Sequence, residues 1–266
     1  MNPPPIARQT CYRAVIALTF LLFLLEASAE DRKRINYLVV EDLATPFQIA
    51  STGVHKGGII SDIVDEVFSD SDYEIKAVTY PVKRLHLFVR ESNPGLWITY
   101  DAKVWNSMAD VGHMIDAPLF TVKHSFLTCS PPVVPFTDDA ALYGAQIAIL
   151  DNFDYPELEQ LASNGRLTLV PVENYQRGFN LVTAHRVSGF VEMEIRLKYN
   201  LKKYDTRADC LTFLDFSPII APYDIYLVVS NTASPDTIQF IRERILHMRE
   251  SGEIKAILGR YQTSTD

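Results

Sequence analysis

The sequence predicts an α/β fold with a mainly parallel sheet and helices on both of its faces. Two observations support this prediction. Short apolar runs alternate along the chain with segments of helical periodicity, which is the order typical of βα units. The clearest of those segments, residues 59–68, has apolar residues every three to four positions with acids between them, so we expect an amphipathic helix there.

The stretch at 80–101 combines a helix with a buried strand and indicates a ligand site. Pro81 is a favourable first-turn residue for a helix, and the apolar run at 96–99 is typical of a buried strand. Ligands of open α/β sheets bind beyond the carboxyl ends of the strands. We therefore expect Thr99 and Tyr100, with Asp101 beside them, at a pocket for a small molecule.

The other elements follow the same alternation, with a boundary at the prolines of 131–135, which cannot continue a central strand. Before this boundary we expect strands at 35–40, 73–79 and 96–99, and helices at 59–68 and 82–89. After it we expect strands at 146–150, 167–171, 189–191, 211–214 and 226–230, and helices at 155–164, 175–185, 192–200 and 254–261. A further helix, capped by Ser234 and Pro235, is expected to end at Gly252.

The first 29 residues have the features of a signal peptide. Arg8 and Arg13 precede an apolar run at 14–25, and Ala27-Ser28-Ala29 after the run has the pattern of a small-residue cleavage site. We expect residues 1–29 to be removed and the protein to be exported. The alternative is that the run stays uncleaved as a membrane anchor.

Charge and cysteine content narrow the function classes. The formal net charge of −8 disfavours nucleic acid, which requires a basic face. The sequence has no Cys-x-x-Cys or His-x-x-x-His pattern, so we expect neither a metal nor a cofactor. Cys129 and Cys210 would be free to pair in an oxidising compartment, although the sequence does not show that they are close.

Several motifs occur in an order that resembles solute-binding protein family 3 of bacterial ABC importers. Pro46-Phe47 followed by Gly58-Ile-Ile-Ser-Asp-Ile63 resembles the opening motif of that family. Four later segments of this sequence resemble the successive motifs of the same family. They are Pro81-x-x-Arg84 with the apolar strand after it, Asp116-Ala-Pro118, the turn at His185–Gly189, and the closing segment from Ser251 to Tyr261.

This resemblance implies two α/β lobes joined by two crossing strands, of the type II-like periplasmic binding protein fold. The expected units are lobe one at 30–125 plus 225–266, and lobe two at 126–224. A small-molecule ligand would be buried when the lobes close, and closure would be communicated to an ABC transporter permease in the membrane. The resemblance also implies a periplasmic monomer.

The sequence departs from this family at the positions that bind an amino acid. In the amino-acid binders, an arginine about nine residues before the proline of the Asp116-Ala-Pro118 step clamps the carboxylate, and an aspartate in lobe two holds the ammonium. Here those positions hold Ala109 and Met193. A charge-assisted bidentate contact is not easily replaced by neutral groups, so we do not expect an ordinary amino-acid ligand.

Aromatic and basic candidates for the site lie in the first half of the chain. Phe47 occupies a family ligand position, and Tyr100 ends a strand, where its ring would stack on a ligand. Arg84 would donate to an anionic ligand from the cleft. The alternative is that Arg84 lies on the surface of its helix, and that Phe47 belongs to the core.

Acidic and amide candidates follow other strands. Asp151 and Asn152 precede the helix at 155–164, whose free N–H groups favour anionic partners. Glu192 follows a short strand and would bind a cationic group or act as a general acid or base. Glu41 ends the first strand. Glu192 and Glu41 have a solvated surface position as their alternative. If Glu192, Glu41 or the adjacent Asp42 lines the cleft, the acidic lining favours a positively charged ligand.

The sequence therefore predicts a periplasmic, non-enzymatic solute-binding protein for ABC-type import of a small polar ligand, an amino acid or a related compound. Two alternatives remain open. One is an orphan periplasmic sensor domain that signals to a membrane receptor, and the other is a dehydratase-like enzyme on the same fold.

Overall fold

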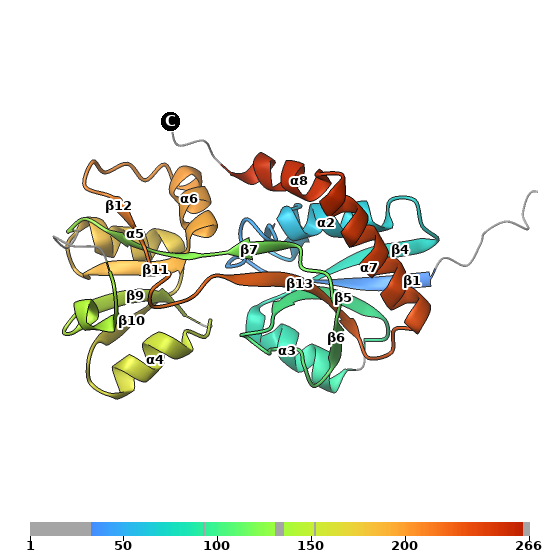
Figure 1. Cartoon of the computed structure of the whole chain (residues 1–266), viewed down its shortest axis with the longest axis horizontal. Helices are drawn as coiled ribbons and strands as arrows, with labels where there is room; N and C mark the ends of the chain where they lie inside the picture. Colours follow the sequence, from blue (N-terminus) through green and yellow to red (C-terminus); the bar gives the residue numbers. More distant parts are fainter. Residues whose placement is uncertain (1–32, 93, 131–135, 152, 263–266) are drawn as a thin grey trace, which may run out of the picture.

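The computed structural model describes residues 33–92, 94–130, 136–151 and 153–262. These residues form two α/β lobes that lie side by side (Figure 1). The expected signal peptide at 1–29, the prolines of 131–135 and Asn152 lie outside the described residues.

The sheet of the first lobe, which we call lobe 1, has the strand order β4-β1-β5-β13-β6, and β7 also pairs with β13. Its strands are β1 (Lys33–Val40), β4 (Tyr73–Tyr80), β5 (Trp97–Ala102), β6 (Gly112–Met114), β7 (Phe120–Val122) and β13 (Tyr223–Ser230). The first three pair in parallel, and β13 runs antiparallel to β5, β6 and β7.

Helices cover both faces of this sheet. They are α2 (Ile59–Phe68), α3 (Val82–Glu91), α7 (Pro235–Glu250) and α8 (Glu253–Tyr261). One core contains α2, α7 and α8 with Tyr37 and Val39 of β1, whereas Leu38 packs on the opposite face with Leu85 of α3. Because a strand buried on both faces must be apolar, the last four residues of β1, 37–40, form an unbroken apolar run.

The sheet of the second lobe, lobe 2, has the strand order β10-β9-β11-β8-β12. Its strands are β8 (His124–Thr128), β9 (Gln146–Leu150), β10 (Thr168–Val172), β11 (Gly189–Met193) and β12 (Thr212–Asp215). Strands β10, β9 and β11 pair in parallel, and β8 is antiparallel to β11 and β12. The chain crosses between the lobes at Lys123 and again between β12 and β13 (Figure 1).

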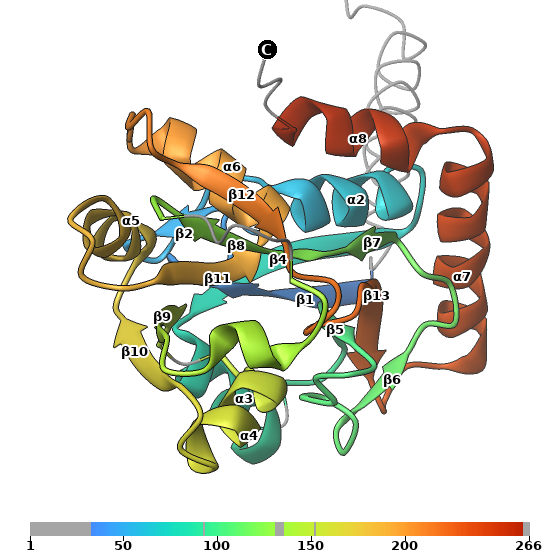
Figure 2. The ribbon, with the colours of Figure 1, turned by 60° about the vertical axis from the view of Figure 1, so that its left-hand side comes forward.

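Lobe 2 also has helices on both faces. They are α4 (Pro156–Ser163), α5 (Tyr175–Thr183) and α6 (Glu194–Lys203), and a single 3-10 turn, η1 (Asp139–Leu142), precedes β9. In Figures 1 and 2, α3 and α4 lie on the same side of the two sheets, and α2 and α6 lie on the other. No helix in the described part of the chain has both the length and the apolar character needed to cross a bilayer.

The α/β class and the two-lobed architecture are confirmed, and the differences are local. The expected helix at 192–200 begins two residues later, at Glu194, so Glu192 belongs to strand β11. The sequence analysis did not identify β6, β7 or the hairpin of β2 (Ala50–Ser51) and β3 (Val54–His55). These strands have two or three residues each, which is too short to show a period.

The opening motif at 46–58 forms one local unit that fixes Phe47. The first N–H groups of α2 have no partner inside the helix; those of Ile59 and Ile60 donate to the carbonyl oxygens of Pro46 and Phe47 at 2.9 and 2.8 Å. Gly58 has φ 126°, and a Cβ atom there would lie 2.6 Å from the oxygen of Phe47. Only glycine allows this approach.

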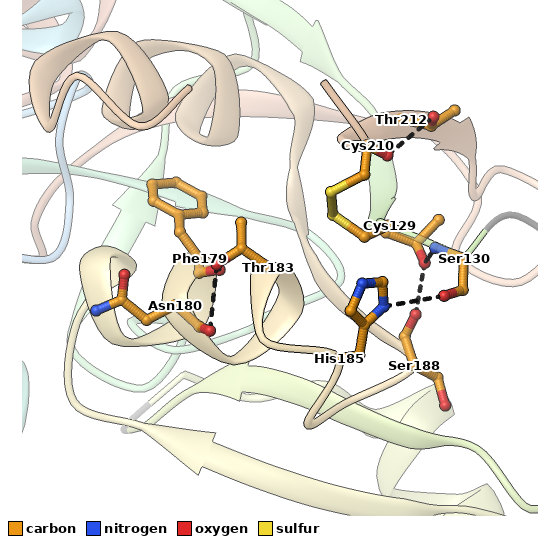
Figure 3. Close-up of a disulfide and its surroundings, with 10 residues drawn as sticks. Cys129, Ser130, Phe179, Asn180, Thr183, His185, Ser188, Cys210 and Thr212 are labelled. Carbon is orange, nitrogen blue, oxygen red and sulfur yellow. Dashed lines mark hydrogen bonds between the residues drawn. A yellow bond between two sulfur atoms is a disulfide. The ribbon is translucent and has the colours of Figure 1, made fainter. Parts of the chain in front are cut away.

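Cys129 and Cys210 form a disulfide that connects residues 81 positions apart (Figure 3). It joins the end of β8 to the segment that leads into β12, so it reinforces one edge of the lobe 2 sheet. Ser130, next to Cys129, is hydrogen-bonded to His185 at 3.3 Å.

Reduction of this disulfide should lower the free energy of unfolding by about 2–4 kcal/mol, because the reduced unfolded chain regains the entropy of a long loop. Urea denaturation with and without a reducing agent measures the difference. The Cys129→Ser/Cys210→Ser variant should match the reduced protein and ignore the reducing agent. Equal midpoints for the oxidised and reduced protein would contradict the prediction.

Candidate functional site

A cavity of about 90 Å³ lies between the two lobes, where strands β1, β5, β9 and β11 end. This volume exceeds the space for one water several times over, so the cavity is large enough for a small organic molecule. The lobe 1 wall is largely apolar and contains Val40, Val82, Leu85, Met108 and Trp105. The lobe 2 wall contributes His124, Phe153, Tyr155, Glu192, Met193 and Arg196.

Arg196, on the first turn of α6, is the principal cation of the cavity. Its residue exposure is only 1%. Its guanidinium carbon lies 4.6 Å from the ring centre of Phe47 in lobe 1 and 5.1 Å from that of Phe153 in lobe 2. Nη2 donates to the Tyr100 hydroxyl at 3.2 Å, and Nη1 donates to Oε1 of Glu192 at 3.4 Å. The guanidinium thus bridges the two lobes.

Glu192 ends β11 one turn before Arg196, with a residue exposure of 1%. Its Oε1 accepts the backbone N–H of Met193 at 2.8 Å as well as Nη1 of Arg196, and its Oε2 accepts the Tyr155 hydroxyl at 2.8 Å. A buried carboxylate requires such partners, because desolvation otherwise disfavours its charge. The charge of Glu192 is therefore compensated within lobe 2.

Three tyrosine hydroxyls line the cavity, and all three stay protonated at neutral pH. Burial is the main cause that raises the pKa of Tyr100, Tyr155 and Tyr223, and the Glu192 carboxylate raises each of them further. The Tyr223 hydroxyl also accepts the indole N–H of Trp105 at 3.0 Å.

His124 stands where the chain enters β8, with its ring against Tyr155 and Tyr223. Burial lowers the pKa of its imidazole to about 4, and the nearby Arg196 lowers it further, while Glu192 opposes the shift. The imidazole is therefore neutral at pH 7. Its Nδ1 is buried and has no hydrogen-bond partner among the described residues.

Asp101 ends β5 and organises the loop that carries Trp105. Its Oδ1 accepts the backbone N–H of Ala102 at 2.8 Å, and its Oδ2 accepts that of Met108 at 2.9 Å. Burial raises the pKa of Asp101, and these backbone donors oppose the rise. The carboxylate thus shapes the lobe 1 wall of the cavity.

The lobes touch each other directly around this cavity. Besides the contact between Arg196 and Tyr100, the Tyr175 hydroxyl of α5 donates to the Leu43 carbonyl oxygen at 3.1 Å. Nδ2 of Asn200 in α6 donates to the Thr45 carbonyl oxygen at 3.2 Å. The structure is therefore a closed form, in which contacts between the lobes surround the cavity.

Four of the residues expected at the site line the cavity: Thr99, Tyr100, Asp101 and Glu192. The Thr99 hydroxyl donates to the Leu38 carbonyl oxygen at 3.1 Å, which turns it toward its own sheet. Phe47 is fully buried and lies behind the Arg196 guanidinium, so it supports the cavity without lining it.

The other expected residues are placed elsewhere. Oε1 of Glu41 accepts the backbone N–H of Gly53 at 2.6 Å and holds the β2–β3 hairpin, away from the cavity. Arg84 is exposed on α3, because α3 turns Leu85 and Val89 toward the sheet. Asp151 is exposed, and its backbone N–H donates to the Val172 carbonyl oxygen. Asn152 lies outside the described residues.

The sequence analysis missed the basic and aromatic residues that make up most of the polar wall: Arg196, His124, Tyr155, Tyr223 and Trp105. The spacing of Glu192 and Arg196 was the available signal, since residues four apart share one face of a helix and pair when charged oppositely. The family pattern places the clamping arginine before Pro118, in lobe 1, and therefore does not indicate Arg196. In the described ranges no cluster of three or more His, Cys, Asp or Glu side chains is arranged to hold a metal ion.

Neither a protein-family model nor a curated protein matches this sequence. Solved structures match it in fold. The chain is similar to a substrate-binding protein of an amino acid ABC transporter from Streptococcus pneumoniae bound to L-arginine, with 12% identity, 87% of this chain and 95% of that chain covered, and a TM-score of 0.64. It is similar to the GluR0 ligand-binding core in complex with L-glutamate, with 15% identity, coverage of 88% and 100%, and a TM-score of 0.67.

A third similar structure is a histidine kinase sensor domain with similarity to periplasmic binding proteins. It has 15% identity, coverage of 87% of this chain and 97% of that chain, and a TM-score of 0.66. The two-lobed periplasmic binding protein fold is therefore common to transport and sensor proteins, and this chain has that fold.

The pair of Glu192 and Arg196 should show strong energetic coupling. Arg196→Leu leaves a buried carboxylate without its cation and should lower the free energy of unfolding by roughly 3–5 kcal/mol. Adding Glu192→Gln should restore part of the loss, which urea denaturation of the single and double variants would reveal. Arg207→Leu, in the exposed pair with Asp205, is the matched control and should change little. Strict additivity of the two changes would refute the coupling.

His124 should make the protein less stable in mild acid. The unfolded chain takes up the proton near the ordinary pKa of 6.5, whereas the buried imidazole takes it up near 4, so stability decreases as the pH falls through this window. The full contribution is on the order of 3 kcal/mol. Denaturation curves of the wild type and His124→Phe from pH 7 to pH 4 measure it. A difference between the two proteins that stays constant with pH would contradict the prediction.

Proposed function

We propose that this protein is an exported solute-binding protein that captures a small ligand between its lobes for ABC-type import. The observation that carries the proposal is the cavity between the lobes, in which both lobes supply the wall and a buried guanidinium crosses from one to the other. A small molecule held there would be enclosed by closure, as the mechanism of two-lobed binding proteins requires.

Three further features support this proposal. The fold is shared with a substrate-binding protein that binds L-arginine and with a core that binds L-glutamate. The features of residues 1–29 favour export to the periplasm, where a disulfide such as Cys129–Cys210 persists. In this role the protein acts as a monomer that presents the closed lobes to a membrane permease.

We also propose that the cavity binds its ligand without turning it over. Glu192, the carboxylate suggested as a general acid or base, already accepts three hydrogen bonds from Tyr155, Met193 and Arg196. Such contacts hold both carboxylate oxygens in place. Turnover of a bound compound that is abolished by Glu192→Gln would instead favour the dehydratase-like alternative.

A sensor domain is the second candidate, and one observation favours it specifically. Direct hydrogen bonds from Arg196, Tyr175 and Asn200 join the lobes around the cavity, so the protein's own contacts help to hold the closed form. A receptor domain that changes its signal when a ligand opens or rearranges these contacts would use this property. The similarity to a histidine kinase sensor domain agrees with this candidate.

A ligand screen tests the proposal. We expect at least one compound among amino acids, polyamines, organic acids and short peptides to raise the melting temperature. A ligand at a hundred times its Kd adds about 2.7 kcal/mol to the free energy of unfolding. Trp105 lines the cavity and the other tryptophan, Trp97, lies in the lobe 1 core, so binding should change Trp105 fluorescence and leave that of a Trp105→Phe variant unaffected. A screen without any hit would count against solute capture and favour the sensor candidate.

A further inference from the structure

The cavity contains more unpaired hydrogen-bond donors than unpaired acceptors. Nε of Arg196 is buried and has no partner within the described ranges. The Tyr100 hydroxyl accepts from Arg196, and the Tyr223 hydroxyl accepts from Trp105. Guanidinium and indole nitrogens can only donate, so both hydroxyls act as acceptors in these bonds and keep their own hydrogens to donate. Among the described residues, neither hydroxyl hydrogen has an acceptor.

Most acceptors of the cavity are already engaged; the neutral imidazole of His124 offers one ring nitrogen as an acceptor and the other as a donor, so it leaves the excess of donors unchanged. Both oxygens of Glu192 accept hydrogen bonds from its neighbours in lobe 2, and both oxygens of Asp101 accept backbone N–H groups of its own loop. Thr99 donates to Leu38. Because buried donors are nearly always paired in folded proteins, the free N–H and O–H groups call for an acceptor-rich partner.

We propose that this cavity recognises a ligand with a carboxylate head group on a compact apolar body. The free edge of the Arg196 guanidinium and the hydroxyl hydrogens of Tyr100 and Tyr223 would donate to the carboxylate. The apolar body would lie against Val40, Leu85 and Met108 of lobe 1. This assignment rests on the proposed function and names the ligand class for the same cavity.

Arg196 suits this role because the rings of Phe47 and Phe153 lie 4.6 and 5.1 Å from its guanidinium carbon and shield it from water. The N–H groups of a guanidinium point outward in its plane, and a planar carboxylate matches that geometry. Tyr175 is also a hydrogen-bond neighbour of Arg196, which lowers the Tyr175 pKa against the effect of burial, but the Tyr175 hydroxyl donates to Leu43, and Nε of Arg196 has no partner among the described residues.

The net charge of the cavity does not select an anion by itself. Glu192 balances Arg196, Asp101 adds a further acid, and Asp154 is exposed at the rim. The unpaired donors decide the assignment. The carboxylates of Glu192 and Asp101 already accept hydrogen bonds from protein groups, whereas Nε of Arg196 and the hydroxyl hydrogens of Tyr100 and Tyr223 have no acceptor among the described residues. A cationic ligand would add donors where donors are already in excess.

The test compares head groups on a constant body. The probes are 4-methylpentanoate, 4-methylpentanamide and 4-methylpentylamine, together with phenylacetate, phenylacetamide and 2-phenylethylamine. Calorimetry with the whole protein should give a Kd at least tenfold lower for a carboxylate than for the amide and the amine of the same body. Tighter binding of an amine, or equal binding of an amide, would overturn the assignment.

Two variants identify the donors through the ratio of carboxylate to amide affinity. Arg196→Lys keeps the charge but removes the planar edge and should reduce this ratio at least tenfold. Tyr223→Phe should reduce the ratio about threefold. This change also removes the acceptor of the Trp105 N–H, and any loss of packing in the cavity that follows would weaken amide binding as well, so the amide affinity serves as the control. Tyr199→Phe, outside the cavity, is the matched control and should leave the ratio unchanged. An unchanged ratio in Tyr223→Phe and in a folded Arg196→Lys would refute the role of these donors.

The outcome separates this assignment from the proposed function. If none of the six probes binds but an amino acid, a polyamine or a peptide does, the carboxylate assignment is wrong and solute capture stands. If the protein binds none of the compounds in either panel, both fail.

Discussion

The buried guanidinium of Arg196 is the interaction on which the closed arrangement of this protein depends. Removing such a cation from water costs several kcal/mol unless its surroundings compensate it. Here the compensation comes from both lobes: Glu192 and Phe153 in lobe 2, and Phe47 and Tyr100 in lobe 1. Because each lobe supplies half of these partners, separation of the lobes would remove half of the compensation for this buried charge.

Several local structures serve to place those partners. Gly58 and the first turn of α2 fix Phe47, and the backbone donors around Asp101 fix the loop that bears Trp105. Residue Glu192 ends β11, so the next residues enter α6 and set Arg196 one turn further on the same face. The site therefore depends on strand ends and first helical turns, which are the rigid parts of an α/β lobe.

The fold was largely predictable from the sequence, and the cavity only in part. Apolar periods at 59–68 and 96–99 identify the βα units because they are local. Thr99 and Tyr100 line the cavity, although β5 continues past them to Ala102 and does not end at Thr99 as expected. Glu192 was found for the same reason. In contrast, Arg84 and Arg196 look alike in sequence, since each lies on a helix and is followed directly by a leucine. Only the tertiary structure shows that α3 turns Arg84 to solvent while α6 inserts Arg196 between two rings.

The position of the arginine has a consequence for how a ligand would act. In the amino-acid binders that the sequence resembles, the clamping arginine belongs to lobe one, so an open lobe already offers it; here Ala109 stands at that position and the guanidinium belongs to lobe 2. In an open form Arg196 would lose Phe47 and Tyr100 and face water, where its contacts with an anion are weak. Closure would restore the low-dielectric setting and both aromatic faces at once. A ligand that pairs with Arg196 would therefore bind the closed form far better than the open one, and that difference in affinity is what allows a ligand to shift the equilibrium between them.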